Sequence, residues 1–143
     1  MQAEHHTAQN PGVSKIRSLL LAARAVIQAD GKAIDLPHPN KTPSPEPVFP
    51  DARPAIARMR EHLQALRAAV LAESVGPSGA NARDLTALTL QETDQSLEKL
   101  AQSFAAPDQA SANKLRGESA GLVRQAKSTS VKAGKALGIP WPL

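Results

Sequence analysis

Half of the prolines in this chain fall within residues 30–51, and this segment constrains the fold more than any other. Six of the 12 prolines lie there, in the run DLPHPNKTPSPEPVFP. Each proline ring fixes φ near about −65° and removes a backbone donor, so the segment forms neither a helix nor a central strand. We predict an extended, proline-rich linker over residues 30–51. It either wraps along the protein surface or tethers the preceding segment to another molecule.

The segment before this linker carries the spacing of an amphipathic helix. Residues 1–12 show no periodicity and end in Asn-Pro-Gly, so we expect a flexible tail there. From residue 13 onward, apolar residues recur at intervals of three and four, which places them on one face of a helix. The predicted helix covers residues 13–29, and its apolar face consists of Val13, Ile16, Leu20, Ala23 and Ile27.

Residues 52–138 contain the spacing of three more helices. The first begins after Asp51, an acidic N-cap, has Pro54 in its first turn and ends near Ser74. The sequence Val-Gly-Pro-Ser-Gly at residues 75–79 then predicts a turn. The apolar face of this helix follows the same spacing and consists of Ile56, Met59, Leu63, Leu66 and Val70, of which all but Met59 are chosen as core residues.

Two long helices are predicted after this turn. The first covers about residues 81–106, and the second covers residues 109–137 behind Asp108 as its cap. Gly117 and Gly121 in the second helix are expected to let another helix approach closely. The residues expected on the buried faces are Leu90, Leu97 and Phe104 in the first helix and Leu115, Leu122, Ala126, Ala133 and Leu137 in the second.

Together these elements predict an all-α protein, an up-and-down bundle of three to four helices with the long proline-rich linker after the first. Aromatic residues make up only 2% of the chain, and alanine is abundant, which suits helices better than a β-sandwich. We expect the helical core within residues 52–138, followed by an apolar C-terminal tail at residues 139–143.

The composition excludes several classes of protein. Because the chain has no cysteine, disulfide scaffolds, thiol catalysis and Cys-ligated metal sites are ruled out. No run of about 18 apolar residues occurs, so no transmembrane helix is expected. The sequence favours a cytoplasmic protein without membrane contact.

Catalytic, cofactor-binding and metal-binding motifs are missing from the sequence. It contains no Gly-rich phosphate loop and no Gly-x-Ser-x-Gly elbow, and no Glu-x-x-His pair falls in a predicted helix. The histidines are scattered: His5 and His6 lie in the tail, His38 between prolines and His62 beside an apolar face. We therefore expect neither an enzyme nor a bound cofactor or metal ion.

Large apolar residues outside the helices favour a role in binding other proteins. The single tryptophan, Trp141, lies in the sequence Ile-Pro-Trp-Pro-Leu, where two prolines reduce the entropy lost on docking. We select Trp141, Leu143, Ile139 and Phe49 as partner-docking residues. An equal alternative is that Trp141 caps the chain's own bundle. The leading hypothesis is a non-enzymatic helical interaction or assembly protein, which forms a homo-oligomer or is a subunit of a complex.

A basic stretch supports an alternative from a different class. The chain has a net charge of +4, and cations outnumber acids most clearly in the last predicted helix. Such side chains would contact phosphates, although no stacking aromatic residues accompany them. The alternative function is a small basic nucleic-acid-binding or regulatory protein, and its contact face would consist of Lys114, Arg116, Arg124, Lys127, Lys132 and Lys135.

Overall fold

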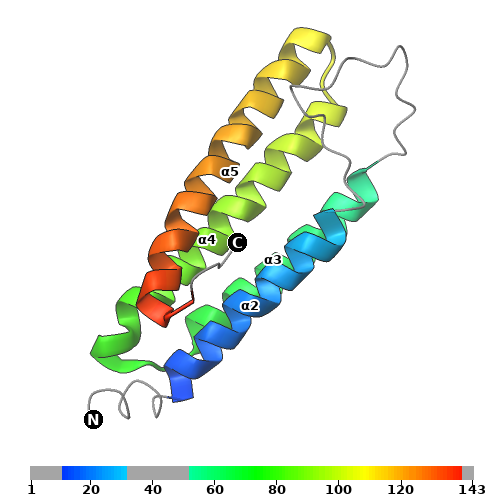
Figure 1. The fold of residues 1–143 in the computed structure, drawn as a ribbon. Coiled ribbons are helices and arrows are strands. Elements are labelled where there is room, and N and C mark those ends of the chain that lie inside the picture. Colours follow the sequence, from blue (N-terminus) through cyan, green and yellow to red (C-terminus); the bar gives the residue numbers. More distant parts are fainter. Residues whose placement is uncertain (1–10, 32–51, 140–143) are drawn as a thin grey trace.

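The structure, a computed structural model, describes residues 11–31 and 52–139. These residues form four helices and no strand, so the predicted all-α bundle is confirmed. The proline-rich linker from residue 32 onward lies outside the described residues. The helices follow one another up and down (Figure 1), and they are α2 (Pro11–Gly31), α3 (Arg53–Ala72), α4 (Gly76–Phe104) and α5 (Gln109–Leu137).

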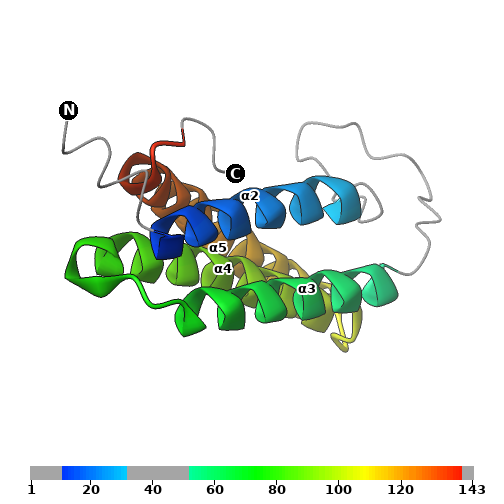
Figure 2. The same ribbon diagram turned by 90° about the horizontal axis from the view of Figure 1, so that it is seen from below.

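Helix α4 is the central helix of the bundle. It packs against α5 over most of its length and also contacts α3 and α2, whereas α2 packs mainly on α3. Figure 2 shows α2 and α3 as one layer beside the α4–α5 pair. Helix α5 has extensive contacts with α4 alone. The side of the bundle between α2 and α5 is therefore less closely packed than the others.

Helix α2 is longer than the predicted 13–29 by two residues at each end. Pro11 occupies its first position, where the missing N–H costs nothing because that donor would have no partner within the helix. Ile16 and Leu20 are fully buried, as the spacing predicts. Gly12 lies so close to Ser74 and Val75 that a Cβ atom would clash with them, and this contact fixes the start of α2 against the α3–α4 turn.

The turn between α3 and α4 is shorter than predicted. Residues 75–79 were expected to form it, but α4 already begins at Gly76, and its N-cap is Val75. A positive φ of 66° at Gly76 provides the reversal, and Pro77 fits the first helical turn. A Cβ atom on Gly79 would lie 2.6 Å from Val75 Cβ, so only glycine allows this close approach.

Helix α3 begins near the predicted position, but with a different cap. It starts at Arg53, with Pro54 in the first turn, and its N-cap is Ala52, which makes no side-chain hydrogen bond. The expected cap, Asp51, lies outside the described residues. Ile56, Leu63 and Val70 are buried, as chosen, and Leu66 is half-buried against them.

Helix α5 has the predicted bounds and the predicted cap. The Asp108 carboxylate accepts a hydrogen bond from the Ser111 N–H at 2.7 Å. The expectation for Gly117 and Gly121 is wrong, since nothing lies within 4 Å of a Cβ on Gly117, and only the Arg124 side chain lies near one on Gly121. These two glycines are on a side of α5 that no described helix covers.

Three predicted core positions on α4 and α5 are also wrong. Phe104 is the last residue of α4 and is 38% exposed. Leu115 and Leu122 are only half-buried. The buried positions on α5 are mainly small residues: Ala112, Ser119, Ala126, Thr129, Ser130, Ala133 and Gly134, with Leu137.

Candidate functional site: an apolar groove between α2 and α5

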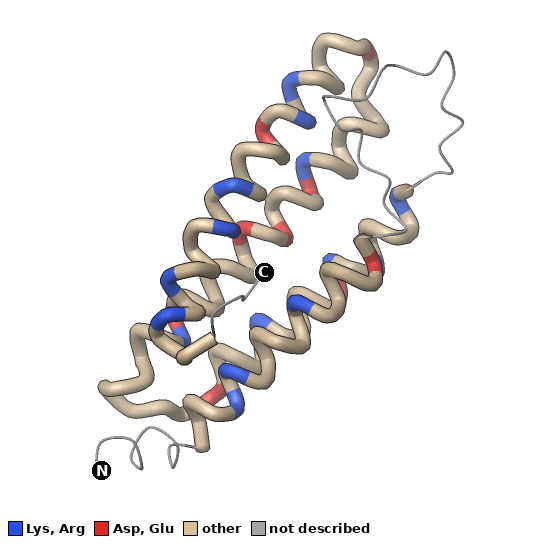
Figure 3. The backbone as a smooth tube through the Cα atoms, viewed as in Figure 1, with Lys and Arg blue, Asp and Glu red and all other residues tan. Residues whose placement is uncertain are grey.

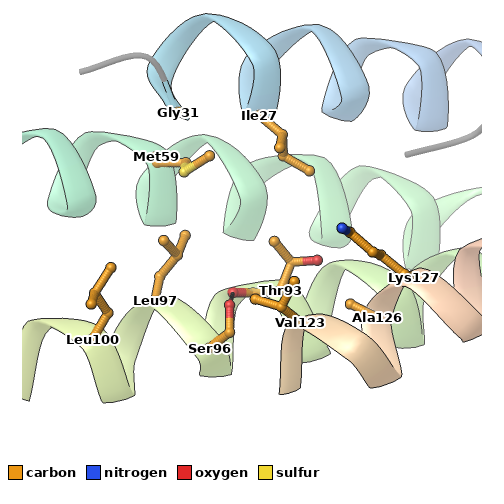
Figure 4. A pocket seen from close by; sticks show the side chains of 10 residues that line it. All are labelled: Ile27, Gly31, Met59, Thr93, Ser96, Leu97, Leu100, Val123, Ala126 and Lys127. Carbon is orange, nitrogen blue, oxygen red and sulfur yellow. Dashed lines mark hydrogen bonds between the residues drawn. The ribbon is translucent and has the colours of Figure 1, made fainter. Parts of the chain in front are cut away.

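The loosely packed side of the bundle contains a groove of about 200 Å³, which we call the α2–α5 groove. All four helices contribute to it, as the close-up in Figure 4 shows. Its walls are aliphatic, and a side chain that entered it would exchange water for apolar contacts. The main lining residues are Ile27 of α2, Met59 of α3, Leu97 and Leu100 of α4, and Val123 and Ala126 of α5.

The groove also has two residues with hydroxyl groups, yet it presents almost no polar surface. Thr93 Oγ1 donates a hydrogen bond to the Thr89 carbonyl oxygen at 2.8 Å. Ser96 Oγ donates in the same way to the Thr93 carbonyl oxygen at 2.6 Å. Because both hydroxyl protons are donated within α4, these groups have no donor left for a bound group, and their oxygens can only accept. The groove is therefore suited to an apolar side chain rather than to a polar substrate.

Lys127 lies at the rim of this groove and is exposed. In Figure 4 its ammonium end points from α5 toward the side of α2 and α3. Val123 and Val131 lie four residues before and after Lys127, so the three share one edge of α5. Val131 is 50% exposed, the largest exposure among the big aliphatic side chains of the described residues. This edge therefore extends the apolar surface of the groove along α5.

Only one of the four predicted partner-docking residues lies within the described residues. Ile139 is 7% exposed and belongs to the chain's own core cluster, so it is not a surface docking residue in this structure. Trp141, Leu143 and Phe49 lie outside the described residues.

The groove itself was not predicted from the sequence. The apolar spacing on this helix favours Leu115 and Leu122 over Val123, although Val123, Lys127 and Val131 follow one another at intervals of four residues.

The predicted basic residues lie along α5, and Figure 3 shows them distributed over the length of the helix. Arg116 lies over the Phe104 ring at 6.0 Å from its centroid. The acidic residue of α5, Glu118, pairs with Lys99 of α4 at 3.1 Å. Within residues 11–31 and 52–139, no ion pair involves the other cations of this helix, which are Lys114, Arg124, Lys127, Lys132 and Lys135.

A polar cluster between α3 and α4 is structural. Arg60 Nε donates to the Asp94 carboxylate at 2.9 Å, and its Nη2 lies 3.6 Å from Glu98. The hydrogen bond to Asp94 raises the pKa of Arg60 above its ordinary value. Gln64 also donates to Asp94, at 3.3 Å. Since both carboxylates face α3 side chains, this cluster links α3 to α4.

His62 is the one histidine among residues 11–31 and 52–139, and it lies beside a carboxylate of α2. His62 Nδ1 lies 3.3 Å from Asp30 Oδ2, in a pair whose histidine side chain is 57% exposed. Among residues 11–31 and 52–139, no three His, Asp or Glu side chains come together as a metal site. The His62–Asp30 pair therefore connects α3 to the end of α2.

None of the four described helices has an apolar stretch sufficient to cross a bilayer. Comparisons of the chain with protein-family models, with curated proteins and with solved structures found no match.

Proposed function

We propose that this protein is a non-enzymatic helical assembly protein that associates with a second copy of itself through the α2–α5 side. The observation that carries this proposal is the α2–α5 groove, a surface of four helices with aliphatic walls and internally bonded hydroxyl groups. Apolar surface of this kind is stabilised when another chain covers it. The cytoplasm is the compartment that we propose for this assembly.

Exposed aliphatic side chains on the two helices that border the groove, outside its lining, support a second copy as the partner. Leu21 of α2 is 41% exposed, and Val131 of α5 is 50% exposed. Two copies that meet along this side would each contribute the same surface, which is the usual form of a twofold symmetric dimer.

Size-exclusion chromatography with light scattering tests the proposal over a range of protein concentrations. We expect a dimer whose mass does not change between low and high salt, because apolar contacts are not screened by ions. Val123→Lys places a charge in the groove and should convert the dimer to a monomer. A monomer at every concentration would contradict self-association and leave a different protein as the partner to identify.

A matched control variant is Leu88→Lys. Leu88 is an aliphatic residue of α4 with 41% exposure and does not line the groove. Both substitutions add one positive charge to the surface of a helix in place of an aliphatic side chain. The dimer should persist in Leu88→Lys, and dissociation of both variants alike would show that net charge, not the groove, controls assembly.

The second candidate function is binding of nucleic acid by α5. The observation that favours it is the set of exposed cations along α5 that have no ion pair within the described residues. Affinity for phosphates would fall steeply as salt increases, because counterions are released on binding. Recording absorbance at 260 and 280 nm in the same chromatography tests it. Elution with no 260 nm absorbance beyond that of the protein's own Trp and Phe side chains, together with no retention on DNA or RNA at low salt, would exclude this function.

A further inference from the structure

The path of the chain after α5 suggests what covers the α2–α5 groove in a single copy. Gly138 has a φ of 72°, the left-handed conformation that ends a helix and reverses the chain. The Ile139 N–H donates to the Gly134 carbonyl oxygen at 2.8 Å, which completes this turn. Ile139 is then buried in the same core cluster as Leu97 and Leu100. The chain therefore leaves the described residues directed back onto the bundle.

The groove is within reach of the next four residues. Lys127 at the rim and Gly134 at the turn are separated by seven residues, which is about 10 Å along an α-helix. Four extended residues span about 13 Å, so residues 140–143 are long enough to reach the rim from Ile139, and Trp141, the second of them, combines about 7 Å of backbone with the length of its own side chain. The prolines at 140 and 142 favour an extended backbone at the residues before them, which are Ile139 and Trp141.

The composition of this segment matches the surface that it can reach. Trp141 is the largest apolar side chain of the protein, and Leu143 follows it. The groove has room for a large side chain and presents aliphatic carbon from all four helices. We propose that residues 140–143 of the same chain occupy the α2–α5 groove in the unassociated protein, with Trp141 inserted between α2 and α5.

This inference rests on the proposed function for its consequence, which is regulation of assembly. A second copy can use the groove only after residues 140–143 of the first copy have left it. Assembly and the internal contact then compete for one surface. Trp141→Ala should therefore increase the dimer fraction at a given protein concentration.

Fluorescence of the single tryptophan tests the inference directly. The chain has no tyrosine, so Trp141 dominates the emission. In dilute, monomeric protein we expect emission at a shorter wavelength than in urea. The quenching constant with acrylamide should be several-fold smaller than in urea.

Variants of the groove test where Trp141 is shielded. Val123→Lys should shift the emission toward the unfolded value while the helical circular dichroism signal remains. Leu88→Lys should leave the emission unchanged. Ile27→Lys, on the opposite wall, repeats the test should Val123→Lys fail to fold.

Three outcomes would overturn the inference. Solvent-exposed emission in the folded monomer would mean that the groove is empty or is covered by residues 32–51. Shielded emission that is lost on dilution together with the dimer would assign the groove to the tryptophan of a second copy. An equal response of Val123→Lys and Leu88→Lys would place Trp141 elsewhere. A chain that is monomeric throughout but has shielded emission would contradict the proposed function and support this inference, so the two failures are distinguishable.

Discussion

The two sides of helix α4 pack by different means. Toward α2 and α3, the fully buried side chains are large aliphatic ones, among them Ile16, Leu20, Ile56 and Leu63, with Leu90 of α4 itself. In the α4–α5 pair, most of the buried residues of α5 are small, and on each helix a series of small buried residues recurs every seven positions. On α4 they are Ala82, Thr89, Ser96 and Ser103, and on α5 they are Ala112, Ser119, Ala126 and Ala133.

The difference between these interfaces lies in what stabilises each. An aliphatic interface gains free energy in proportion to the apolar area that it removes from water. The small-residue interface buries less area per residue, but it allows the two helix backbones to come close and form polar contacts. Ser119 Oγ donates to the Ser96 carbonyl oxygen at 2.7 Å, and Thr129 Oγ1 donates to the Glu92 carboxylate at 2.6 Å. The first interface should therefore be sensitive to lost atoms and the second to added ones.

Loss of atoms from the aliphatic interface should have the largest effect. Leu63 is completely buried, so Leu63→Ala leaves a cavity and should lower the free energy of unfolding by about 2–5 kcal/mol. Leu71 on the same helix is 46% exposed, and Leu71→Ala should change stability by no more than about 0.5 kcal/mol. Urea denaturation followed by circular dichroism measures both values, and equal losses would contradict the assignment of Leu63 to the core.

Addition of atoms to the small-residue interface should have the next largest effect. Ala133 is fully buried on α5, and Ala133→Leu should destabilise the protein by about 1–3 kcal/mol because the added side chain separates α4 from α5. Ala136 on the same helix is exposed, so Ala136→Leu provides the control. Thermal unfolding of the two variants compares them. A stable Ala133→Leu protein would mean that the two helices are not closely packed at this position.

These two interfaces also differ in how well the sequence predicts them. The three-four spacing of large aliphatic residues identified α2 and α3 and the buried positions Ile16, Leu20, Ile56 and Leu63. Between α4 and α5 the same rule selected Leu115 and Leu122, which are half-buried, and did not select Ser119 and Ser130, which are buried. Hydropathy ranks serine and threonine as surface residues, but their hydroxyl groups can bond to a carbonyl oxygen of their own helix and then pack as small apolar groups.

The groove could not be predicted from the sequence for a related reason. Its lining comes from four helices, and Ile27, Met59 and Leu97 carry the same pattern as residues that are fully covered. Whether a residue on an apolar face meets another helix depends on the positions of all four helices. The turn at Gly76 shows a similar limit, because the pattern Val-Gly-Pro-Ser-Gly is compatible with both a loop and the first turn of a helix.

Removal of one hydrogen bond between α4 and α5 should have a smaller effect than either packing change. Ser119→Ala removes the bond to Ser96 and should cost about 1 kcal/mol of unfolding free energy. Ser128→Ala, at an exposed position of the same helix, is the matched control and should be close to neutral. Urea denaturation resolves this difference. If both variants behave like the wild type, the interface depends on the close packing of small residues and not on this bond.

The smallest effect concerns the cap of α5, which differs from the packing terms in its dependence on pH. The hydrogen bond from the Ser111 N–H lowers the pKa of Asp108 from its ordinary value of 3.8. A carboxylate whose pKa is lower in the folded state stabilises it above the unfolded pKa, and this contribution disappears as the pH falls through the folded pKa. Asp108→Asn should therefore lower the Tm slightly at neutral pH, where the charged cap also interacts favourably with the helix dipole. The difference in Tm from the wild type should vanish in acid well below pH 3.8.

Asp84→Asn is the control. It removes an exposed carboxylate of α4 and should leave the Tm at neutral pH nearly unchanged. A Tm difference for Asp108→Asn that is the same at both pH values would mean that the charge of this cap does not contribute to the stability of α5.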